Sequence, residues 1–524
     1  MKEYLPTLLI ASLALASCGD PSRTSAVDEY PTRLVVSEGE GMSNFHPTSG
    51  YGQAGVSPIY DGLLRPVPRG QGQLPSFEPA LAAAQPARHG STWTVTLKEG
   101  ITFSDGTAFD AADVVASYEA AKDTGRGSEV AGSYSVIDRV EATTPHEVVF
   151  YLKEPLSDIS ARLTYPITPS EKLTEQEFPS SDLAAHPVGT GAYKLQERRG
   201  NDSVFVANED YWAGAPEIKE LIITSAADDA SRGQRVAAGE LDGAVIPQVQ
   251  AKNFRSNERV HMDVAKGADW RAVSLPAGLD PAVRRAMNLA TNRQALIDGP
   301  LAGYGAPAST PISPVYGDAY NPAATYPLDV AKAEQLLDEA GWRRGSDGVR
   351  AKGGVRLEMS LYYTGVDTTR RDVAIEFAAH MKKVGIDVQP MAGTWDEITP
   401  KMSSAAVILG GGEMPYDLTM AAVDYLHTRT PETSPYHNAG NYGSAELDGV
   451  LVQAMREADP TRANELWHKA QGLYMENPSL VMIGTVDHVY VSKPNKWQKP
   501  ELQLEPHVHG AMWGPWWRLA EWTR

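Results

Sequence analysis

The sequence predicts an α/β protein with two or three lobes, and three observations indicate this class. The chain has 524 residues, which is more than one core usually organises. Hydrophobic residues make up 42% of it, enough for real cores, while 46 glycines and 37 prolines imply many turns. The second half alternates strand-like and helix-like segments, which is typical of an α/β fold.

The first half opens with clear strand and helix signals. The segment "WTVTLKEG" alternates apolar and polar residues from Trp93 and ends at Gly100, as a half-buried strand does. Asp110 precedes a helical stripe that includes Val114 and Tyr118, so we expect it to be the N-cap residue. The further elements expected in this half are a strand at 147–152, a strand pair around Gly200, a helix at 226–239 and a strand in "LDGAVI".

The second half contains the strongest α/β pattern. Pro281 follows Asp280 at the expected start of a helix, and a later helix should end at Gly341. The strand "VRLEMSLYYT", a helix at about 367–384 and the strand "GIDVQPM" form a β-α-β unit, which favours parallel pairing. The C-terminal tryptophans are expected to pack inside the protein rather than stack on a ligand; they are Trp513, Trp516, Trp517 and Trp522.

The N-terminus has the pattern of an export signal. Residues 1–17 hold one lysine and then an apolar run that is too short to span a bilayer as a mature helix. The sequence "LASC" resembles the bacterial lipobox, which implies cleavage before Cys18, the only cysteine, and a lipid on its sulfur. The alternative is a conventional signal peptide with an unused cysteine. Residues 18–32 are polar and are expected to form a tether.

Composition excludes some classes of partner and of site. The formal net charge is −19, so the surface should repel phosphates, and no nucleic acid partner is expected. No nucleophile elbow, H-E-x-x-H or phosphate-binding glycine loop occurs. His507 and His509 could hold a metal from one side of a strand, but exposed histidines without a function are commoner. We therefore expect no cofactor and no catalysis, which leaves a binding protein.

Six segments, in this order, resemble the family 5 solute-binding proteins of ABC importers, which include dipeptide, oligopeptide and nickel-chelate receptors. These segments are "FSDGTAFDAADVVASYEAA", "VGTGAYKL", "NEDYWAGAPEIKELII", "AAGELDGAV", "VRRAMNLATNRQALI" and "DVAKAEQLLDEAGW". The resemblance implies a two-lobed periplasmic-binding-protein fold, known as the Venus flytrap, with an extra α/β subdomain in lobe I. Lobe I would comprise 33–272 and 490–524, the extra subdomain about 62–190, and lobe II 273–489.

The resemblance also implies where ligand is bound. In peptide receptors of the family, an Asp in a lobe II loop binds the α-ammonium group of the substrate. Here that loop is "LGGGEMPYDLTMAAVDYL", and either Glu413 or Asp417 could serve, although a loop-capping role is equally expected. In nickel-type relatives a histidine and first-lobe arginines bind the chelate, which points to His437 and Arg126; Arg162 is displaced from the place of a second arginine. The ligand-binding residues expected are Tyr51, Gln53, Arg126, Glu413, Tyr416, Asp417 and His437.

Three functions remain open from the sequence. The first is an exported, lipid-anchored receptor that captures short peptides between its lobes and delivers them to an ABC permease. The second is a receptor for nickel or another metal held by a small chelator, on the same fold. The third, from another class, is an extracytoplasmic enzyme or chaperone built on this scaffold.

Overall fold

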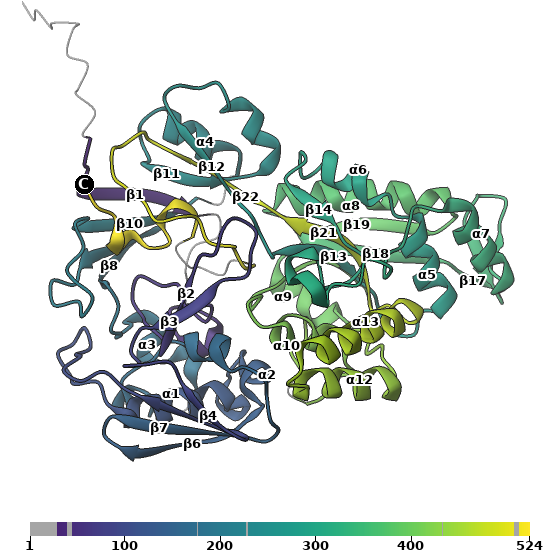
Figure 1. Cartoon of the computed structure of the whole chain (residues 1–524). Coiled ribbons are helices and arrows are strands. Elements are labelled where there is room, and N and C mark those ends of the chain that lie inside the picture. Colours follow the sequence, from purple (N-terminus) through teal and green to yellow (C-terminus); the bar gives the residue numbers. More distant parts are fainter. Residues whose placement is uncertain (1–28, 39–43, 175–176, 227–228, 432, 508–512) are drawn as a thin grey trace, which may run out of the picture.

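The computed structural model describes residues 29–38, 44–174, 177–226, 229–431, 433–507 and 513–524 (Figure 1). Cys18, the signal segment and His509 lie outside these residues. Figure 1 shows two bodies, each built on a large β-sheet, which we call lobe I and lobe II. Among the described residues, no helix combines the length and the apolar character needed to cross a membrane.

Lobe I is built on a seven-stranded mixed sheet with the order β12-β22-β11-β1-β10-β9-β8. The first strand pairs in parallel with β10 and β11, and the last strand of the chain enters the same sheet antiparallel to β11 and β12. The strands are β1 (Arg33–Glu38), β8 (Tyr193–Arg199), β9 (Asp202–Ala207), β10 (Glu220–Ser225), β11 (Gly243–Ile246), β12 (His261–Ala265) and β22 (His488–Ser492). Helix α4 (Asp229–Ala237) packs on β11.

A second, smaller α/β unit lies in the chain between β1 and β8. It has an antiparallel sheet of order β4-β5-β7-β6, covered by α1, and a separate β2-β3 hairpin. Its elements are β2 (Leu64–Val67), β3 (Ser76–Pro79), β4 (Ala87–His89), β5 (Thr92–Thr96), α1 (Ala111–Lys122), α2 (Ala131–Tyr134), β6 (Ile137–Thr144), β7 (Glu147–Leu152) and α3 (Asp182–Ala185).

Lobe II is built on a six-stranded sheet of order β14-β21-β13-β20-β18-β19. Its strands are β13 (Trp270–Ser274), β14 (Gly305–Pro307), β18 (Glu358–Thr364), β19 (Asp387–Gly393), β20 (Ala406–Gly411) and β21 (Leu480–Val486). A three-stranded sheet of β15 (Arg343–Arg344), β16 (Arg350–Lys352) and β17 (Val355–Arg356) lies at the far end.

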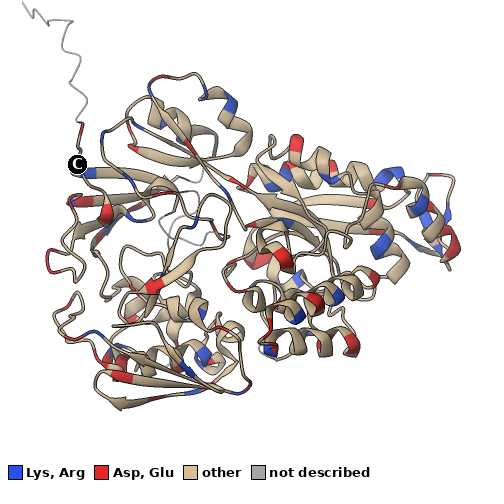
Figure 2. Ribbon diagram, viewed as in Figure 1, with Lys and Arg blue, Asp and Glu red and all other residues tan. Residues whose placement is uncertain are grey.

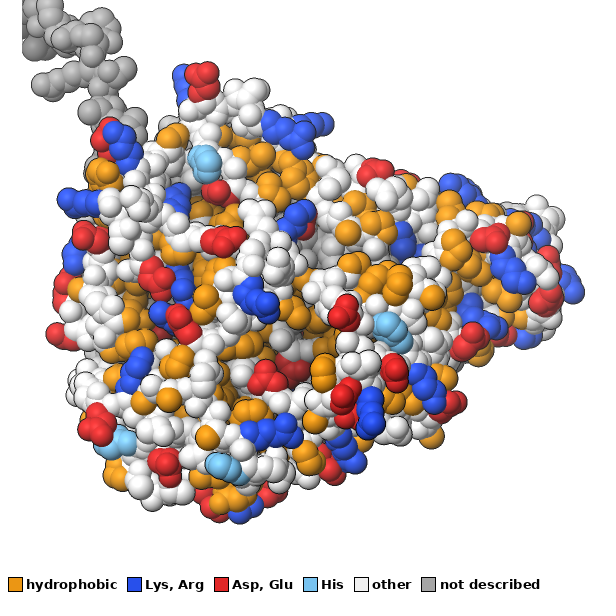
Figure 3. Space-filling model, viewed as in Figure 1, with side chains coloured by type: hydrophobic (Ala, Val, Ile, Leu, Met, Phe, Trp, Pro, Cys, Tyr) orange, Lys and Arg blue, Asp and Glu red, His pale blue; other side chains and the backbone are white. Residues whose placement is uncertain are grey.

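The helices of lobe II pack on this sheet and on one another. They are α5 (Pro281–Ala290), α6 (Arg293–Asp298), α7 (Val330–Glu339), α8 (Thr368–Lys383), α9 (Trp395–Ile398), α10 (Leu418–Ala421), α11 (Val423–Leu426), α12 (Ala445–Arg456) and α13 (Pro460–Glu476). Acidic and basic side chains interleave along these helices (Figure 2). On the face seen in Figure 3, hydrophobic, acidic and basic side chains are likewise mixed over both lobes.

Local sequence signals explain several of these elements. Asp110 caps α1, because its carboxylate accepts a hydrogen bond from the amide of Ala112 at 2.7 Å, and Asp113 completes a capping box. Asp280 caps α5 in the same way. Strands β18 and β19 pair in parallel around α8, as the β-α-β pattern predicts. The four C-terminal tryptophans are buried in the lobe I core, which confirms the packing prediction.

The chain passes between the two sheets twice. It leaves the sheet of lobe I after β12 and enters that of lobe II at β13, and it returns between β21 and β22 through Asp487. A third segment joins the first crossing, because Glu505 forms a parallel bridge with Gly267. Three short stretches of chain that lie beside one another therefore join the lobes.

Candidate functional site

Residues 412–420 of lobe II, which we call the interlobe loop, contact lobe I. Three of its side chains, Met414, Tyr416 and Met420, are buried in the hydrophobic core cluster of lobe I. The hydroxyl of Tyr416 donates to the carbonyl oxygen of Leu504 at 2.9 Å, and its ring lies 6.3 Å from that of Phe77. This structure thus has its lobes in contact.

The interlobe loop begins at Gly412, a position where the backbone leaves no room for a side chain. Gly412 has φ of +95°, in the left-handed region, and a Cβ there would lie 2.6 Å from the carbonyl oxygen of Ala268. The amide of His507 donates to the carbonyl oxygen of Gly412 at 2.9 Å. Gly412 therefore lets the strand β20 end against the crossing segments.

Asp417 caps a helix and also pairs with a cation of lobe I. One carboxylate oxygen accepts from the amide and the hydroxyl of Thr419, each at 2.8 Å, and so caps helix α10. The other oxygen forms an ion pair with the guanidinium of Arg162, which belongs to lobe I. Arg162 also donates to the hydroxyl of Thr419 at 3.0 Å and to the carbonyl oxygen of Ser133 at 3.1 Å.

Glu413 and His437 lie together in lobe II, on either side of Tyr425. The hydroxyl of Tyr425 donates to Glu413 at 3.1 Å, and the ring of Tyr425 lies 4.3 Å from that of His437. The imidazole of His437 lies 3.5 Å from the carboxylate of Asp424. Burial acts to lower the pKa of His437, but the nearby carboxylates of Asp424 and Glu413 outweigh it and raise the pKa.

The three first-lobe residues expected at the site lie in different surroundings. Tyr51 is buried, and its ring packs against Phe45; burial raises the pKa of its hydroxyl. Gln53 is half-buried, and its carbonyl oxygen accepts from Thr164. The guanidinium of Arg126 lies over the Phe178 ring at 4.2 Å. Arg126 also donates to the carbonyl oxygen of Leu173 at 2.7 Å.

A buried charged network lies where the chain crosses between the lobes. The two imidazole nitrogens of His488 contact Glu505 at 2.5 Å and Asp269 at 3.0 Å. Asp269 also contacts Arg271 at 2.5 Å and His507 at 3.0 Å. Burial acts to lower the pKa of His488, but hydrogen bonds to Asp269 and Glu505 and their charges raise it to about 10.

The sequence did not predict this charged network, and the network shows that the expectation for His507 was wrong. His507 is not an exposed histidine: its side chain is 12% exposed and bonded to Asp269. Among the described residues, no group of three or more His, Cys, Asp or Glu side chains is arranged to hold a metal ion. The charged pair Asp487–His488 interrupts an otherwise apolar run between two strands, and that interruption is the sequence signal that could have found the network.

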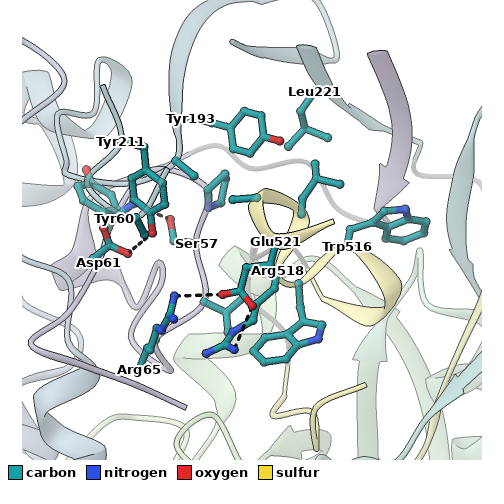
Figure 4. A pocket seen from close by; sticks show the side chains of 18 of the residues that line it. Ser57, Tyr60, Asp61, Arg65, Tyr193, Tyr211, Leu221, Trp516, Arg518 and Glu521 are labelled. Atoms are coloured by element: carbon teal, nitrogen blue, oxygen red, sulfur yellow. Dashed lines mark hydrogen bonds and ion pairs between the residues drawn. The ribbon is translucent and has the colours of Figure 1, made fainter. Parts of the chain in front are cut away.

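A separate cavity of about 190 Å³ lies within lobe I (Figure 4). Its wall carries Asp61, whose carboxylate accepts from Tyr211 at 3.3 Å, and an ion pair of Arg65 with Glu521 at 3.1 Å. Burial raises the pKa of Asp61, although hydrogen bonds from Trp212 and other donors oppose this. None of the seven expected ligand-binding residues lines this cavity.

Two glycines and one acid in the segments that resemble the family have structural roles. A Cβ on Gly189 would lie 2.3 Å from the carbonyl oxygen of Ile59, and one on Gly191 would lie 2.3 Å from its carbonyl carbon. Asp242 accepts from the amide of Val35 at 2.7 Å and from Lys493 at 2.8 Å. These residues set the close approach of neighbouring segments within lobe I.

Sequence comparison defines the class of protein. The model of the bacterial extracellular solute-binding proteins, family 5 Middle, matches residues 76–427. Protein XP55 of Streptomyces lividans is 35% identical over 484 residues, which cover 91% of this chain and 87% of that protein. The chain belongs to the family 5 extracellular solute-binding proteins, the solute-binding components of ABC importers.

Solved structures of similar shape confirm the two-lobed fold. NikZ from Campylobacter jejuni, in complex with Ni(L-His), superposes with a TM-score of 0.81 at 22% identity over 94% of this chain and 99% of that one. The oligopeptide-binding protein AppA from Bacillus subtilis, in complex with a nonapeptide, gives 0.79 at 20% identity over 95% and 99%. The family and these neighbours are binding proteins, in keeping with the class expected from the sequence.

Proposed function

We propose that this protein is an extracytoplasmic receptor that captures short peptides between its lobes and delivers them to an ABC permease. The observation that carries this proposal is the interlobe loop, which brings Tyr416 and Asp417 into contact with lobe I. A ligand bound there would be shielded from water, so that each polar contact with it would be strengthened. The peptide complex of the similarly folded AppA supports the choice of ligand class.

The proposal includes the arrangement of the chain outside the cytoplasm. Cleavage before Cys18 would leave residues 18–32 as a tether, with a lipid on Cys18 holding the receptor at the outer face of the membrane. The expected boundaries at 272/273 and 489/490 fall inside β13 and β22. With these two strands kept whole, lobe I would comprise 33–269 with 488–524, including the extra subdomain near 62–190, and lobe II would comprise 270–487. The permease would recognise the state in which the lobes are closed.

The direct test is native mass spectrometry of the protein purified without refolding, followed by titration with mixtures of di- to pentapeptides. We expect a co-purified or added peptide at a stoichiometry of one, which fragmentation would identify. A matched variant, Tyr416→Phe, removes the hydroxyl that reaches Leu504 and should weaken binding if closure is required. Absence of binding and of thermal stabilisation with every peptide mixture would contradict the proposal.

A nickel or other metal chelate is the second candidate ligand, because the structural neighbour NikZ holds Ni(L-His). His437 is the residue expected to reach such a metal. The raised pKa of His437 opposes this role, since metals bind the neutral imidazole and a proton competes for the same nitrogen. The test is calorimetric titration of the wild type and of His437→Ala with nickel and histidine. A lower affinity of the variant for the nickel–histidine complex would support a metal chelate as the ligand, and an equal affinity would contradict a role of His437.

A further inference from the structure

The starting observation is that the acid expected to hold a peptide's α-ammonium group already has a positive partner. Arg162 lies on the 3₁₀ turn Ser160–Thr164 of lobe I, and its side chain is 2% exposed. Asp417, on lobe II, is 17% exposed. The two residues are 255 positions apart in the sequence, so only the contact between the lobes brings them together.

Arg162 is held in place by contacts to each of its guanidinium nitrogens. Nε donates to the carbonyl oxygen of Ser133 at 3.1 Å, within lobe I. Nη1 pairs with Asp417, and Nη2 donates to the hydroxyl of Thr419 at 3.0 Å, both across to lobe II. The backbone is fixed as well, because the hydroxyl of the buried Tyr118 donates to the carbonyl oxygen of Arg162 at 2.8 Å.

Both carboxylate oxygens of Asp417 also have partners already. Two of its hydrogen bonds cap helix α10 through Thr419, and its remaining oxygen faces Arg162. An incoming ammonium group would have to displace Arg162, which would leave a guanidinium buried without its carboxylate. Removing one partner of a buried pair costs more than the pair itself contributes, because the remaining charge is neither solvated nor compensated.

The other candidate acid of the loop is compensated too. Glu413 accepts a hydrogen bond from the hydroxyl of Tyr425 at 3.1 Å, and its charge favours the protonated forms of Arg271 and His437. Neither acid of the interlobe loop therefore presents an unbalanced negative charge to a ligand. A positively charged N-terminus gains no net electrostatic advantage from either of them.

We propose that the Arg162–Asp417 pair is a latch between the lobes that takes the place of the ligand's α-ammonium group, so that the receptor binds N-acylated or cyclic peptides as well as free ones. Arg162 is thus a specificity-determining residue, since it neutralises the acid that would otherwise select a charged N-terminus. The latch also holds the lobes together without ligand. This inference rests on the proposed peptide function for its ligand class only, because the latch itself needs no ligand.

Ligand selectivity is tested with matched peptides. Tri- to pentapeptides, each in a free and an N-acetylated form, compete in native mass spectrometry for the wild type, Arg162→Gln, Asp417→Asn and the double variant. In the wild type we expect the two forms to bind within about threefold of each other, and Asp417→Asn to leave that ratio unchanged. Arg162→Gln should prefer the free form at least tenfold, and the double variant should lose this preference.

The contradicting results are equally specific. A wild-type preference of tenfold or more for the free form, abolished by Asp417→Asn, would show that Asp417 binds the ammonium group and would overturn the inference. Arg162→Gln removes a buried side chain and can fail to fold; Asp417→Asn nearly preserves shape, so its ratio alone still decides the question.

The latch is tested separately, without ligand, by energy transfer between dyes on two introduced cysteines. Cys18 is the only cysteine in the chain, so Cys18→Ser removes the natural thiol. In this background, Glu99→Cys in lobe I and Lys383→Cys in lobe II supply the two labelling sites. We expect Asp417→Asn to lower the transfer efficiency, because the lobes separate. Unchanged transfer would refute the latch.

The chain offers a matched control for both measurements. Arg456 of lobe II forms an ion pair with Glu154 of lobe I at 2.8 Å, but the side chains are 45% and 54% exposed. Such an exposed pair contributes little. Arg456→Gln should therefore leave the transfer efficiency and the peptide ratio unchanged. If no peptide binds the wild type, the peptide function fails, while the energy-transfer result still supports or refutes the latch.

Discussion

Replacing His488 by glutamine should remove a pH-dependent contribution to the stability of this protein. The imidazole of His488 is 11% exposed and bridges the carboxylates of Asp269 and Glu505, which come from two different segments of the crossing region. A glutamine amide can still donate to one carboxylate, but it carries no charge and does not titrate. The variant isolates the electrostatic contribution of the imidazolium.

The magnitude follows from the pKa. The pKa of His488 is raised from 6.5 to about 10 on folding, because the attraction and hydrogen bonds of the two carboxylates exceed the effect of burial. A group with a raised folded pKa stabilises fully below pH 6.5 and loses its contribution as pH rises toward the folded pKa. At about 1.4 kcal/mol per pH unit, the loss between pH 6.5 and 9 is about 3 kcal/mol.

The assay is urea unfolding, followed by tryptophan fluorescence, of the wild type and His488→Gln at pH 6 and pH 9. At pH 6 we expect the variant to be less stable by about 3–5 kcal/mol, the usual cost of breaking a buried ion pair. At pH 9 the difference should shrink by about 3 kcal/mol, because the wild type has lost most of the histidine's contribution. Thermal midpoints at the two pH values provide a second reading.

The matched control is His186→Gln. His186 contacts Asp182 at 2.8 Å, but its side chain is 77% exposed, so its removal should change neither the stability nor its pH dependence measurably. A difference between wild type and His488→Gln that is the same at pH 6 and pH 9 would refute the reasoning. It would mean that His488 contributes by packing or by neutral hydrogen bonds only.

The remaining predictions concern three sites, Asp110, Gly191 and Tyr416, with Gly90→Val as the control for Gly191. Asp110→Ala removes the cap of α1 and should lower the free energy of unfolding by about 1 kcal/mol, measured by urea unfolding; an unchanged value would contradict the capping contact. Gly191→Val places a side chain on the backbone of Ile59 and should abolish soluble expression or lower the thermal midpoint steeply, whereas Gly90→Val, in open space but at φ of +67°, should cost less. Tyr416→Phe should lower the free energy of unfolding by about 1 kcal/mol through its lost hydrogen bond; no change would indicate that water replaces the contact.

The sequence determined the local elements and the family. Asp110 and Asp280 cap the helices that the apolar stripes predict, and β18, α8 and β19 form the parallel unit read from their pattern. The helices depend on residues within a few positions of one another, so periodicity and capping suffice to find them. The parallel pairing of β18 with β19 joins residues further apart, but the order strand, helix, strand favours it. The order of the six resembling segments likewise needs no tertiary contact, and the comparisons confirm the family and the two-lobed fold.

The tertiary structure alone decided how the polar groups pair. The sequence offered Asp417 as either a cap or an ammonium anchor, and it gave Arg162 only as a displaced arginine. Their contact depends on how two lobes meet, over 255 residues of chain. The same holds for His488, whose two carboxylate partners lie 219 and 17 positions away. Sequence spacing does not show which charges pair, because the partner of a carboxylate is the cation that folding brings within a few ångströms of it.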